Sequence, residues 1–380
     1  MSIKIAYLDY SHIFAGAERV LYTIISHLDK TVYEPILVFP YPMEHQKEYL
    51  RLGCEVVYLS DSLKWWMGSD RWKHPVRGTD FLMRTILGYR LARYLKKNKI
   101  DILHVNLLRP DSLMWIYFAK RLGIKIIGHF RSQALSWIPP KIVQRNCDLI
   151  LCVSQYSRSR MLIKGEYTES KVLYDSIDID SFKINETSNE SKKKLGFPET
   201  CFLISSIGQL SRHKGHDNAI RAFAKIALVH PQTVLFIAGG GTDLKYLEQL
   251  VSELPSAIKE RIFFSKKQLS NIIEVYNASD LVLSLTKVGE AFGLVPFESA
   301  IMGKPFIAPN KGAVKEFIEN KRNGILVDTE NVDEITTAID WIIKNPMEVK
   351  KMNSLASQLV QEKLTPSVMI SNLENIYRSC

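Results

Sequence analysis

The sequence predicts an α/β protein built from two Rossmann-like domains that face each other across a cleft. Three observations lead to this prediction. Short apolar runs alternate with longer amphipathic segments along the whole chain, which is typical of parallel sheets covered by helices. A polar stretch at 185–194 divides this alternation into two series and is expected to be a linker. The 380 residues are enough for two domains of ordinary size.

The first series is expected to form a domain over residues 1–180. Its first helix shows the pattern well, because Val20, Leu21, Ile24, Ile25 and Leu28 fall on one helical face. The predicted strands cover 3–9, 35–39, 55–59, 101–106, 124–129 and 148–153. The predicted helices cover 17–28, 44–52, 81–97, 110–122, 140–146 and 155–164.

The second series is expected to form a domain over residues 195–365. Its predicted strands cover 202–207, 233–238, 262–264, 280–285, 305–308 and 324–327. Its predicted helices cover 216–230, 243–254, 269–278, a segment beginning after Gly293, and 313–319. Three more helices follow to the C-terminus, and Pro366 is suited to begin the last one.

Composition limits the class of protein. Hydrophobic residues make up 46% and charged residues 24%, which is a soluble globular balance, and no apolar run reaches the ~20 residues of a membrane span. The chain starts directly with a strand, without a signal-peptide pattern. Five scattered cysteines include no Cys-x-x-Cys pair. We therefore expect reduced thiols, no structural zinc and a cytoplasmic location.

A formal net charge of +10 suggests an anionic partner. Nucleic acid, an anionic membrane and phosphorylated substrates are the three candidates. The sequence contains no zinc finger, homeodomain-like or aromatic RNA-binding motif, so nucleic acid is not expected.

The most informative motif covers residues 289–298 and contains two glutamates with seven residues between them. Glu290 falls on a loop after a buried strand, and Glu298 falls about two turns into the following helix. The backbone amides of Gly293 and Leu294, next to Phe292, are expected at the N-terminus of this helix, where an anion binds favourably. Carboxylates in these places can accept hydrogen bonds from sugar hydroxyls.

Basic and polar side chains follow other predicted strands. Lys214 lies in the segment Gly208–Gly215, where a cation at a strand's carboxyl end can neutralise a pyrophosphate. His129 ends the strand 124–129, at an edge where open α/β sheets bind ligands. His104 ends another strand and is read as structural or peripheral. Gly16 lies in a small turn after the first strand, which permits close approach to a phosphate or an acceptor.

These segments, in this order and spacing, resemble the retaining glycosyltransferases of the GT4 family (glycosyltransferase group 1), which have the GT-B architecture. The resemblance implies that the first domain binds the acceptor and the second the nucleotide-sugar donor. It implies that the last helix, 366–380, crosses back to the first domain.

The resemblance also assigns roles to individual residues. It implies that Glu290 holds the donor sugar and Glu298 the nucleotide ribose, that Lys214 holds the diphosphate, and that His129 orients the sugar and steadies developing positive charge. The nucleotide site would also include Gly16, Gln209, Phe292, Gly293 and Leu294.

Two positions depart from the family pattern. Ala15 replaces a usual glycine, which weakens the expectation of close backbone approach at that turn. Gln209 stands where an arginine is usual, and glutamine carries no charge. Either Arg212 supplies the missing cation, or the site holds the leaving phosphate more weakly.

The expected activity is retaining transfer of a sugar from a nucleotide sugar to a hydroxyl of a glycan or lipid-linked acceptor. A uridine diphosphate donor is favoured over a guanosine diphosphate donor, and cell-surface polysaccharide or oligosaccharide assembly is the expected setting. The nucleotide sugar is a co-substrate, and neither a cofactor nor a metal ion is expected. Two alternatives stay open: a nucleotide-sugar epimerase of the same architecture, and a catalytically weakened sugar-nucleotide-binding subunit, which Gln209 favours.

Tryptophans lie beside cations at Lys64–Trp66 and Arg71–Lys73, and a basic helix is predicted at 81–97. This composition suits contact with an anionic membrane surface, and we expect peripheral attachment to the inner face of the cell membrane. The alternative is that the cations form a solvated face and the tryptophans a wall of the acceptor site.

Overall fold

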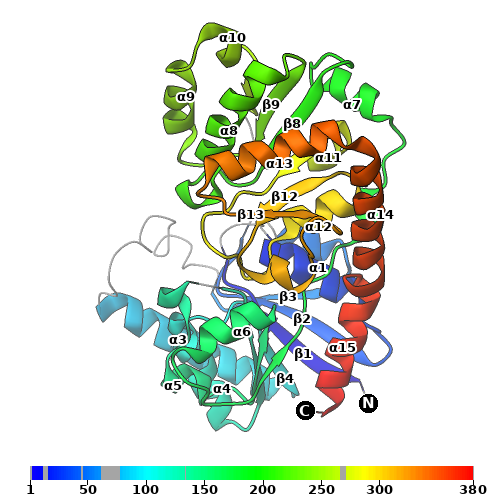
Figure 1. Ribbon diagram of the computed structural model, residues 1–380. Coiled ribbons are helices and arrows are strands. Elements are labelled where there is room, and N and C mark those ends of the chain that lie inside the picture. The colour runs from blue at the N-terminus through cyan, green and yellow to red at the C-terminus, as the bar shows by residue number, and fades with distance from the viewer. Residues whose placement is uncertain are drawn as a thin grey trace. The chain divides into compact units, whose positions relative to one another are not determined.

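The structure is a computed structural model that describes residues 2–11, 16–43, 46–60, 78–132, 134–265 and 271–379. The chain forms two compact units (Figure 1). The first consists of Met1–Ser176 together with Pro366–Cys380, and the second consists of Ile177–Thr365. Each unit has its own parallel sheet and its own core.

The sheet of the first unit has seven parallel strands in the order β3-β2-β1-β4-β5-β6-β7. The strand order therefore reverses between β1 and β4, and ligands of open α/β sheets bind at such a point. The strands are β1 Ile3–Leu8, β2 Tyr33–Phe39, β3 Glu55–Tyr58, β4 Ile102–Val105, β5 Lys125–Phe130, β6 Leu149–Cys152 and β7 Ser170–Val172.

Helices cover both faces of this sheet. Alternate residues of β1 point to opposite faces, so that Leu8 packs in the core with α3 and α4 while Tyr7 packs in the core with α1 and α15. Helix α15, drawn in red, lies beside these first strands although it comes last in the sequence (Figure 1). The helices are α1 Gly16–His27, α2 Gln46–Leu50, α3 Gly78–Lys97, α4 Leu113–Arg121, α5 Lys141–Gln144, α6 Gln155–Leu162 and α15 Pro366–Ser379, with 3-10 turns η3 Pro110–Ser112 and η4 Leu135–Trp137.

The sheet of the second unit has six parallel strands in the order β10-β9-β8-β11-β12-β13, and it reverses between β8 and β11. The strands are β8 Phe202–Ile207, β9 Thr233–Ala238, β10 Ile262–Phe264, β11 Leu281–Leu283, β12 Phe306–Pro309 and β13 Ile325–Val327. The helices are α7 Ser188–Lys194, α8 His216–Val229, α9 Leu244–Ser252, α10 Ser256–Lys259, α11 Ile272–Ala278, α12 Leu294–Ile301, α13 Val332–Lys344 and α14 Pro346–Lys363, with 3-10 turns η5 Ile179–Phe182, η6 Arg212–Lys214 and η7 Ala313–Glu316.

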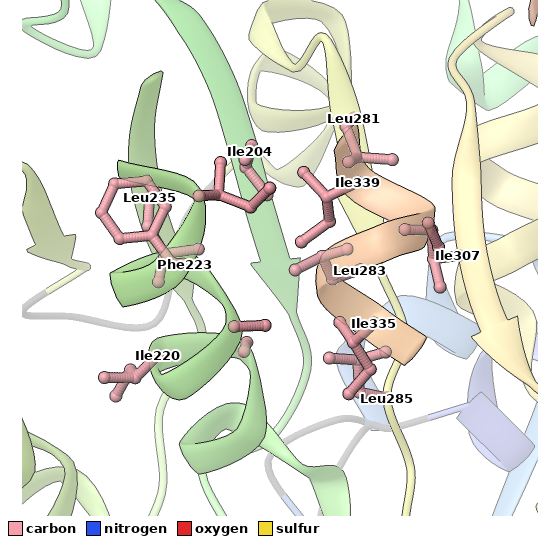
Figure 2. Close-up of a cluster of buried hydrophobic side chains, with 14 of the residues drawn as sticks. Ile204, Ile220, Phe223, Leu235, Leu281, Leu283, Leu285, Ile307, Ile335 and Ile339 are labelled. Atoms are coloured by element: carbon pink, nitrogen blue, oxygen red, sulfur yellow. The ribbon is translucent and has the colours of Figure 1, made fainter. Parts of the chain in front are cut away.

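The core of the second unit fixes the two strands on either side of the reversal. Figure 2 shows Phe223 of α8 packed near Ile204 of β8, and Ile339 of α13 near Leu281 and Leu283 of β11. All of these side chains are fully buried. Because burying one such side chain contributes roughly 1.5–3 kcal/mol, the positions of β8 and β11 are strongly determined.

The structure confirms the predicted α/β class with two Rossmann-like parallel sheets. Some local predictions were wrong or incomplete. The polar stretch 185–194 is not a linker, because Thr187 and Glu190 form a capping box that begins α7. Strand β7 was not predicted, since Val172 is the one apolar residue among its three. The helix predicted at 313–319 is the short turn η7.

Candidate functional site

The loops that follow β8 and β11 meet at the carboxyl edge of the second sheet. The backbone amide of Lys287 donates a 2.7 Å hydrogen bond to the carbonyl of His213. Gly215 passes so close to β11 that a Cβ atom there would lie 2.0 Å from the Leu285 carbonyl oxygen. Glycine is therefore required at 215, and the tight approach brings the residues beside it against the loop that carries Glu290.

Lys214 and Glu290 are in direct contact across these two loops. The Lys214 Nζ atom donates a short hydrogen bond to Glu290 Oε1. Their side chains are 26% and 19% exposed, so both charged groups remain accessible to a ligand. The structure thus brings together the two residues that the sequence assigned to the diphosphate and to the donor sugar.

Gly293 fixes the second oxygen of the same carboxylate. Its φ angle is 84°, and a Cβ atom there would lie 2.6 Å from Glu290 Oε2. Helix α12 begins directly after it at Leu294, so the first amides of this helix have no acceptor within the helix. The Glu290 carbonyl also accepts a 3.1 Å hydrogen bond from the Ala313 amide. Glu290 therefore lies against a helix N-terminus with its backbone fixed.

A small pocket adjoins this carboxylate. It is lined by Glu290, Phe292 and Gly293 on one side and by residues that follow β12 on the other. Those residues include Lys311, which donates a 3.0 Å hydrogen bond to the Lys287 carbonyl. Phe292 is buried in a cluster of aromatic rings and supports the start of α12.

Glu298 is buried on α12, and its Oε2 atom accepts a 2.6 Å hydrogen bond from the Tyr276 hydroxyl of α11. This bond holds the second glutamate of the motif in place. Tyr276 was missed by sequence reasoning, because nothing in the residues around it distinguishes it from an ordinary core tyrosine.

Arg212 and Lys214 both lie on the loop after β8, but they contact different neighbouring segments. The Arg212 guanidinium carbon lies 3.2 Å from the ring centroid of Tyr246, and its Nε atom lies 3.7 Å from Asp243 Oδ2. These residues follow β9, whereas the partner of Lys214 follows β11. Gln209, on the same loop, is exposed. The positive charge of Arg212 is therefore placed on the β9 side of the loop.

His216 holds the backbone of this loop. Its Nδ1 atom lies 2.8 Å from Ser206 Oγ, and its Nε2 atom lies 3.2 Å from the Gln209 carbonyl oxygen. Burial lowers the pKa of His216 to about 4, so the imidazole is neutral near pH 7. Because a carbonyl only accepts, Nε2 carries the proton. No role was predicted for His216, although it directly follows the Lys-Gly pair in the sequence.

His129 lies in a polar row at the carboxyl edge of the first sheet. Since Leu8 pairs with Val105 and Val105 with Gly128, the next residues Asp9, Asn106 and His129 form one row across β1, β4 and β5. All three are buried. Within the described part of the chain, the side-chain amide of Asn106 and His129 Nε2 have no hydrogen-bond partner. Buried polar groups normally have one, so this row is the first unit's candidate for binding a hydroxyl-rich ligand.

The environment of His129 keeps its imidazole neutral. Burial lowers the pKa of His129 well below its usual value, and the nearby Arg131 cation lowers it further. Arg131 Nη2 lies 3.2 Å from His129 Nδ1, and Arg131 is ion-paired with Asp175. His104, read from the sequence as structural or peripheral, has its Nε2 atom 3.3 Å from the same Nδ1.

Several predicted features are only partly described. Gly16 is the first residue of α1, and the preceding turn residues 12–15 lie outside the described part. The tryptophan segments at 64–66 and 71–73 also lie outside it. Among the described residues, no three His, Cys, Asp or Glu side chains are grouped to hold a metal ion. The described helices include none with the length and apolar content of a membrane span.

Two family models match the chain, one for each half. The model described as Glycosyl transferases group 1 matches residues 187–358, which contain Lys214, Glu290 and Glu298. The model described as Glycosyltransferase Family 4 matches residues 14–181, which contain His129. The chain belongs to the group 1 glycosyltransferases of family 4. This confirms the resemblance inferred from the sequence motifs.

Curated relatives of this glycosyltransferase have low sequence identity to it but match most of its length. A GDP-mannose-dependent monoacylated phosphatidylinositol monomannoside mannosyltransferase of Corynebacterium glutamicum is 23% identical over 81% of this chain and 83% of its own length. An N-acetyl-α-D-glucosaminyl L-malate synthase of Bacillus anthracis is 25% identical over 77% of this chain and 78% of its own length.

Solved structures show the same fold. Anabaena HepE in complex with UDP-glucose has a TM-score of 0.83 at 19% identity over the whole of both chains. The sucrose-phosphate synthase of Thermosynechococcus elongatus has a TM-score of 0.76 at 16% identity over 99% of this chain and 98% of its own. The predicted GT-B fold class of the glycosyltransferase is thereby confirmed.

We expect Gly293→Ala to lower sugar transfer by about 10²-fold while the protein stays folded, because a methyl group at 293 displaces the Glu290 carboxylate. Gly303→Ala is the matched control, since Gly303 also has a positive φ of 66° but no atom lies within 4 Å of its Cβ position. Initial rates and melting temperatures of both variants test this. An equal loss of activity in both would attribute the effect to backbone strain instead of Glu290.

Proposed function

We propose that this glycosyltransferase is a retaining hexosyltransferase that moves a sugar from a nucleotide sugar to an acceptor hydroxyl. The observation that carries the proposal is the contact of Lys214 with Glu290 beside the N-terminus of α12, at the reversal of the second sheet. A cation, a helix N-terminus and a carboxylate then lie together where a sugar diphosphate carries its charge and its hydroxyls.

Donor binding would separate Lys214 from Glu290 and give each of them a new partner. The diphosphate takes Lys214 and the free amides of Gly293 and Leu294 as hydrogen-bond donors. The Glu290 carboxylate then accepts hydrogen bonds from sugar hydroxyls. Each charged group leaves one partner for another, so neither is left buried and unpaired during binding.

Glu298 is suited to bind the nucleotide ribose. Its carboxylate is buried and held by the Tyr276 hydroxyl, so little side-chain entropy remains to be lost when a ribose hydroxyl donates to it. Gln209, on the loop after β8, and Gly16, the first residue of α1, are proposed to contact the phosphates and the sugar.

The proposed step is a front-face substitution at the anomeric carbon. The bond from this carbon to the phosphate oxygen breaks, the acceptor oxygen forms a new bond on the same face, and the departing phosphate takes the acceptor proton. Lys214 and the α12 amides stabilise the negative charge that develops on the phosphate. His129 of the first unit donates a hydrogen bond from Nε2 to the donor sugar and orients it.

We propose a uridine diphosphate donor and a glycan or lipid-linked acceptor in cell-surface polysaccharide or oligosaccharide assembly. HepE, whose fold this chain shares, has been solved with UDP and UDP-glucose. The Corynebacterium relative is named as using GDP-mannose, which makes a guanosine diphosphate donor the competing candidate. Release of nucleoside diphosphate from UDP-sugars and GDP-sugars, with and without acceptor, distinguishes the two donors.

A second candidate function is a sugar-nucleotide-binding subunit with weak catalysis. Two observations favour it: Gln209 carries no charge, and Arg212 is engaged with Asp243 and Tyr246. Binding of UDP-sugars without release of UDP under any acceptor condition would support this candidate over the transferase.

Lys214→Ala is expected to lower turnover by about 10²–10³-fold, because removal of one preorganised donor to a developing anion has an effect of this size. Lys120→Ala is the control: Lys120 also forms a partly exposed ion pair, with Asp148, but belongs to α4 of the first unit, whereas Lys214 belongs to the second. Steady-state rates, with melting temperatures as a check on folding, provide the measurement. A fully active Lys214→Ala enzyme would refute the electrostatic role of this lysine.

We propose that catalysis needs no metal ion, since Lys214 and the α12 amides supply positive charge at the leaving group. Transfer rates are therefore expected to be unchanged in excess EDTA. The assay compares chelated enzyme with enzyme supplied with Mg²⁺ or Mn²⁺. Loss of activity in chelator and its recovery with the metal ion would overturn this proposal.

We also propose that α3 attaches the protein peripherally to an anionic membrane on its cytoplasmic side. Leu82, Ile86 and Tyr89 are exposed at helical spacing on one stripe of α3. The stripe continues into three exposed cations, Arg93, Lys96 and Lys97. An apolar segment followed by cations is the composition of helices that lie in the membrane interface.

Leu82→Ser with Ile86→Ser should abolish flotation with vesicles that contain phosphatidylglycerol. Leu228→Ser with Val229→Ser is the control, because these exposed apolar residues belong to α8 of the second unit. Vesicles of phosphatidylcholine alone test the need for anionic lipid. Absence of binding by the unmodified protein to either vesicle would refute membrane attachment.

A further inference from the structure

A buried chain of hydrogen-bonding groups connects the C-terminal helix to His129 inside the first unit. The Tyr7 and Tyr377 hydroxyl oxygens are 2.9 Å apart, and the Tyr377 hydroxyl is 2.6 Å from His104 Nδ1. His104 Nε2 is in turn 3.3 Å from His129 Nδ1. All four side chains are buried, with exposures of 2% or less. Tyr377 belongs to α15, which lies beside the first strands of the sheet (Figure 1).

Arg131 indicates which groups of this hydrogen-bond chain donate and which accept. A guanidinium only donates hydrogen bonds, and Arg131 Nη2 lies 3.2 Å from His129 Nδ1. His129 Nδ1 is therefore the unprotonated nitrogen, and the proton of the neutral ring is on Nε2. The same acceptor then receives the hydrogen of His104 Nε2.

The donor and acceptor roles of His104, Tyr377 and Tyr7 follow from the position of the His129 proton. With its proton on Nε2, neutral His104 has an acceptor at Nδ1, and the Tyr377 hydroxyl donates to it. Tyr7 can then donate to the Tyr377 oxygen. Burial lowers the pKa of His104 to about 3, with a smaller effect of Arg131, so this ring is neutral over the physiological range. Hydrogen-bond direction, and not charge, therefore determines which nitrogens carry protons.

We propose that Tyr377 and His104 are positioning residues that act together with Arg131 to hold His129 in the tautomer with a proton on Nε2. The inference rests on the proposed role of His129 at the donor sugar. His129 Nε2 is buried and has no partner among the described residues, so it can present this proton to a hydroxyl oxygen of the sugar. In the opposite tautomer, an N–H at Nδ1 would face the donor groups of Arg131, His104 would have to move its own proton to Nδ1, and His129 Nε2 would offer no proton.

The first test is spectroscopic and does not depend on activity. In protein with ¹⁵N-labelled histidine, the signals absent from His129→Gln identify His129. The unmodified protein should show a protonated Nε2 and an unprotonated Nδ1 for this residue. Tyr377→Phe removes the hydroxyl that donates to His104 Nδ1, so His104 becomes free to carry its proton there and to accept at Nε2. Arg131 then acts on His129 without this support, and we expect a detectable fraction of the opposite His129 tautomer. A single unchanged tautomer in this variant would overturn the proposal.

The second test is kinetic. Tyr377→Phe should lower kcat about 10-fold with little change in the KM for the donor, since an unmade buried hydrogen bond typically has an effect of this size. Tyr33→Phe is the matched control. The Tyr33 hydroxyl donates a 3.4 Å hydrogen bond to the Glu374 carbonyl of the same helix, and the Tyr33 ring lies 5.8 Å from that of Tyr377. Its hydroxyl is not part of the hydrogen-bond chain that leads to His129. An equal fall of kcat in both variants would show a general effect on α15 and refute positioning.

Two further variants make the outcome decisive. If Tyr377→Phe does not fold, His104→Gln makes the same spectroscopic test, because it removes the second ring and leaves α15 unchanged; mixed tautomers of His129 support the proposal and a single one overturns it. Full activity of His129→Gln would refute the proposed role of His129 itself, and the positioning role with it. An inactive His129→Gln together with an unaffected Tyr377→Phe would leave the proposed function standing and remove only this inference.

Discussion

The contact between Lys214 and Glu290 is the interaction on which the second unit's site depends. It exists because the strand order reverses between β8 and β11, which brings two loops 76 residues apart in sequence to the same point. A partly exposed ion pair adds little to stability, about 0–1 kcal/mol. The proposed function offers another reason for its closeness. In that proposal, the two charged groups neutralise each other until the sugar nucleotide separates them.

Two glycines and a buried histidine fix the backbone of the loops that carry Lys214 and Glu290. Gly215 lets the β8 loop pass beside the Leu285 carbonyl, and Gly293 leaves room for the Glu290 carboxylate. His216, kept neutral by burial, anchors the Gln209 carbonyl and so the same loop. None of these groups needs to change its charge during transfer. In the proposed function, the site would offer fixed positive potential with little reorganisation, and such an arrangement stabilises a developing anion effectively.

The order of strands and helices could be predicted from the sequence because both sheets are parallel, and parallel strands read as apolar runs between amphipathic helices. The same reasoning placed Lys214, Glu290 and His129 at strand ends. Side-chain partners could not be predicted, since they depend on distant residues: Tyr276 for Glu298, and Asp243 and Tyr246 for Arg212. Helix α7 was missed for a different reason. Its many polar residues favoured a linker, although the Thr187–Glu190 capping box was present in the sequence.

The C-terminal helix joins the stability of the first unit to its chemistry. Met369, Ile370, Leu373, Ile376 and Tyr377 of α15 are buried in the same core as Tyr7 and the residues of α1. At roughly 1.5–3 kcal/mol for each fully buried apolar side chain, this contact is strong enough to fix the helix on the sheet. The Tyr377 hydroxyl is then held beside His104 without a further loss of side-chain freedom. Because the Tyr377 side chain is already immobile, its hydrogen bond to His104 costs little entropy. In the proposed positioning role, this explains how the last turn of α15 can influence which nitrogen of His129 on β5 carries the proton.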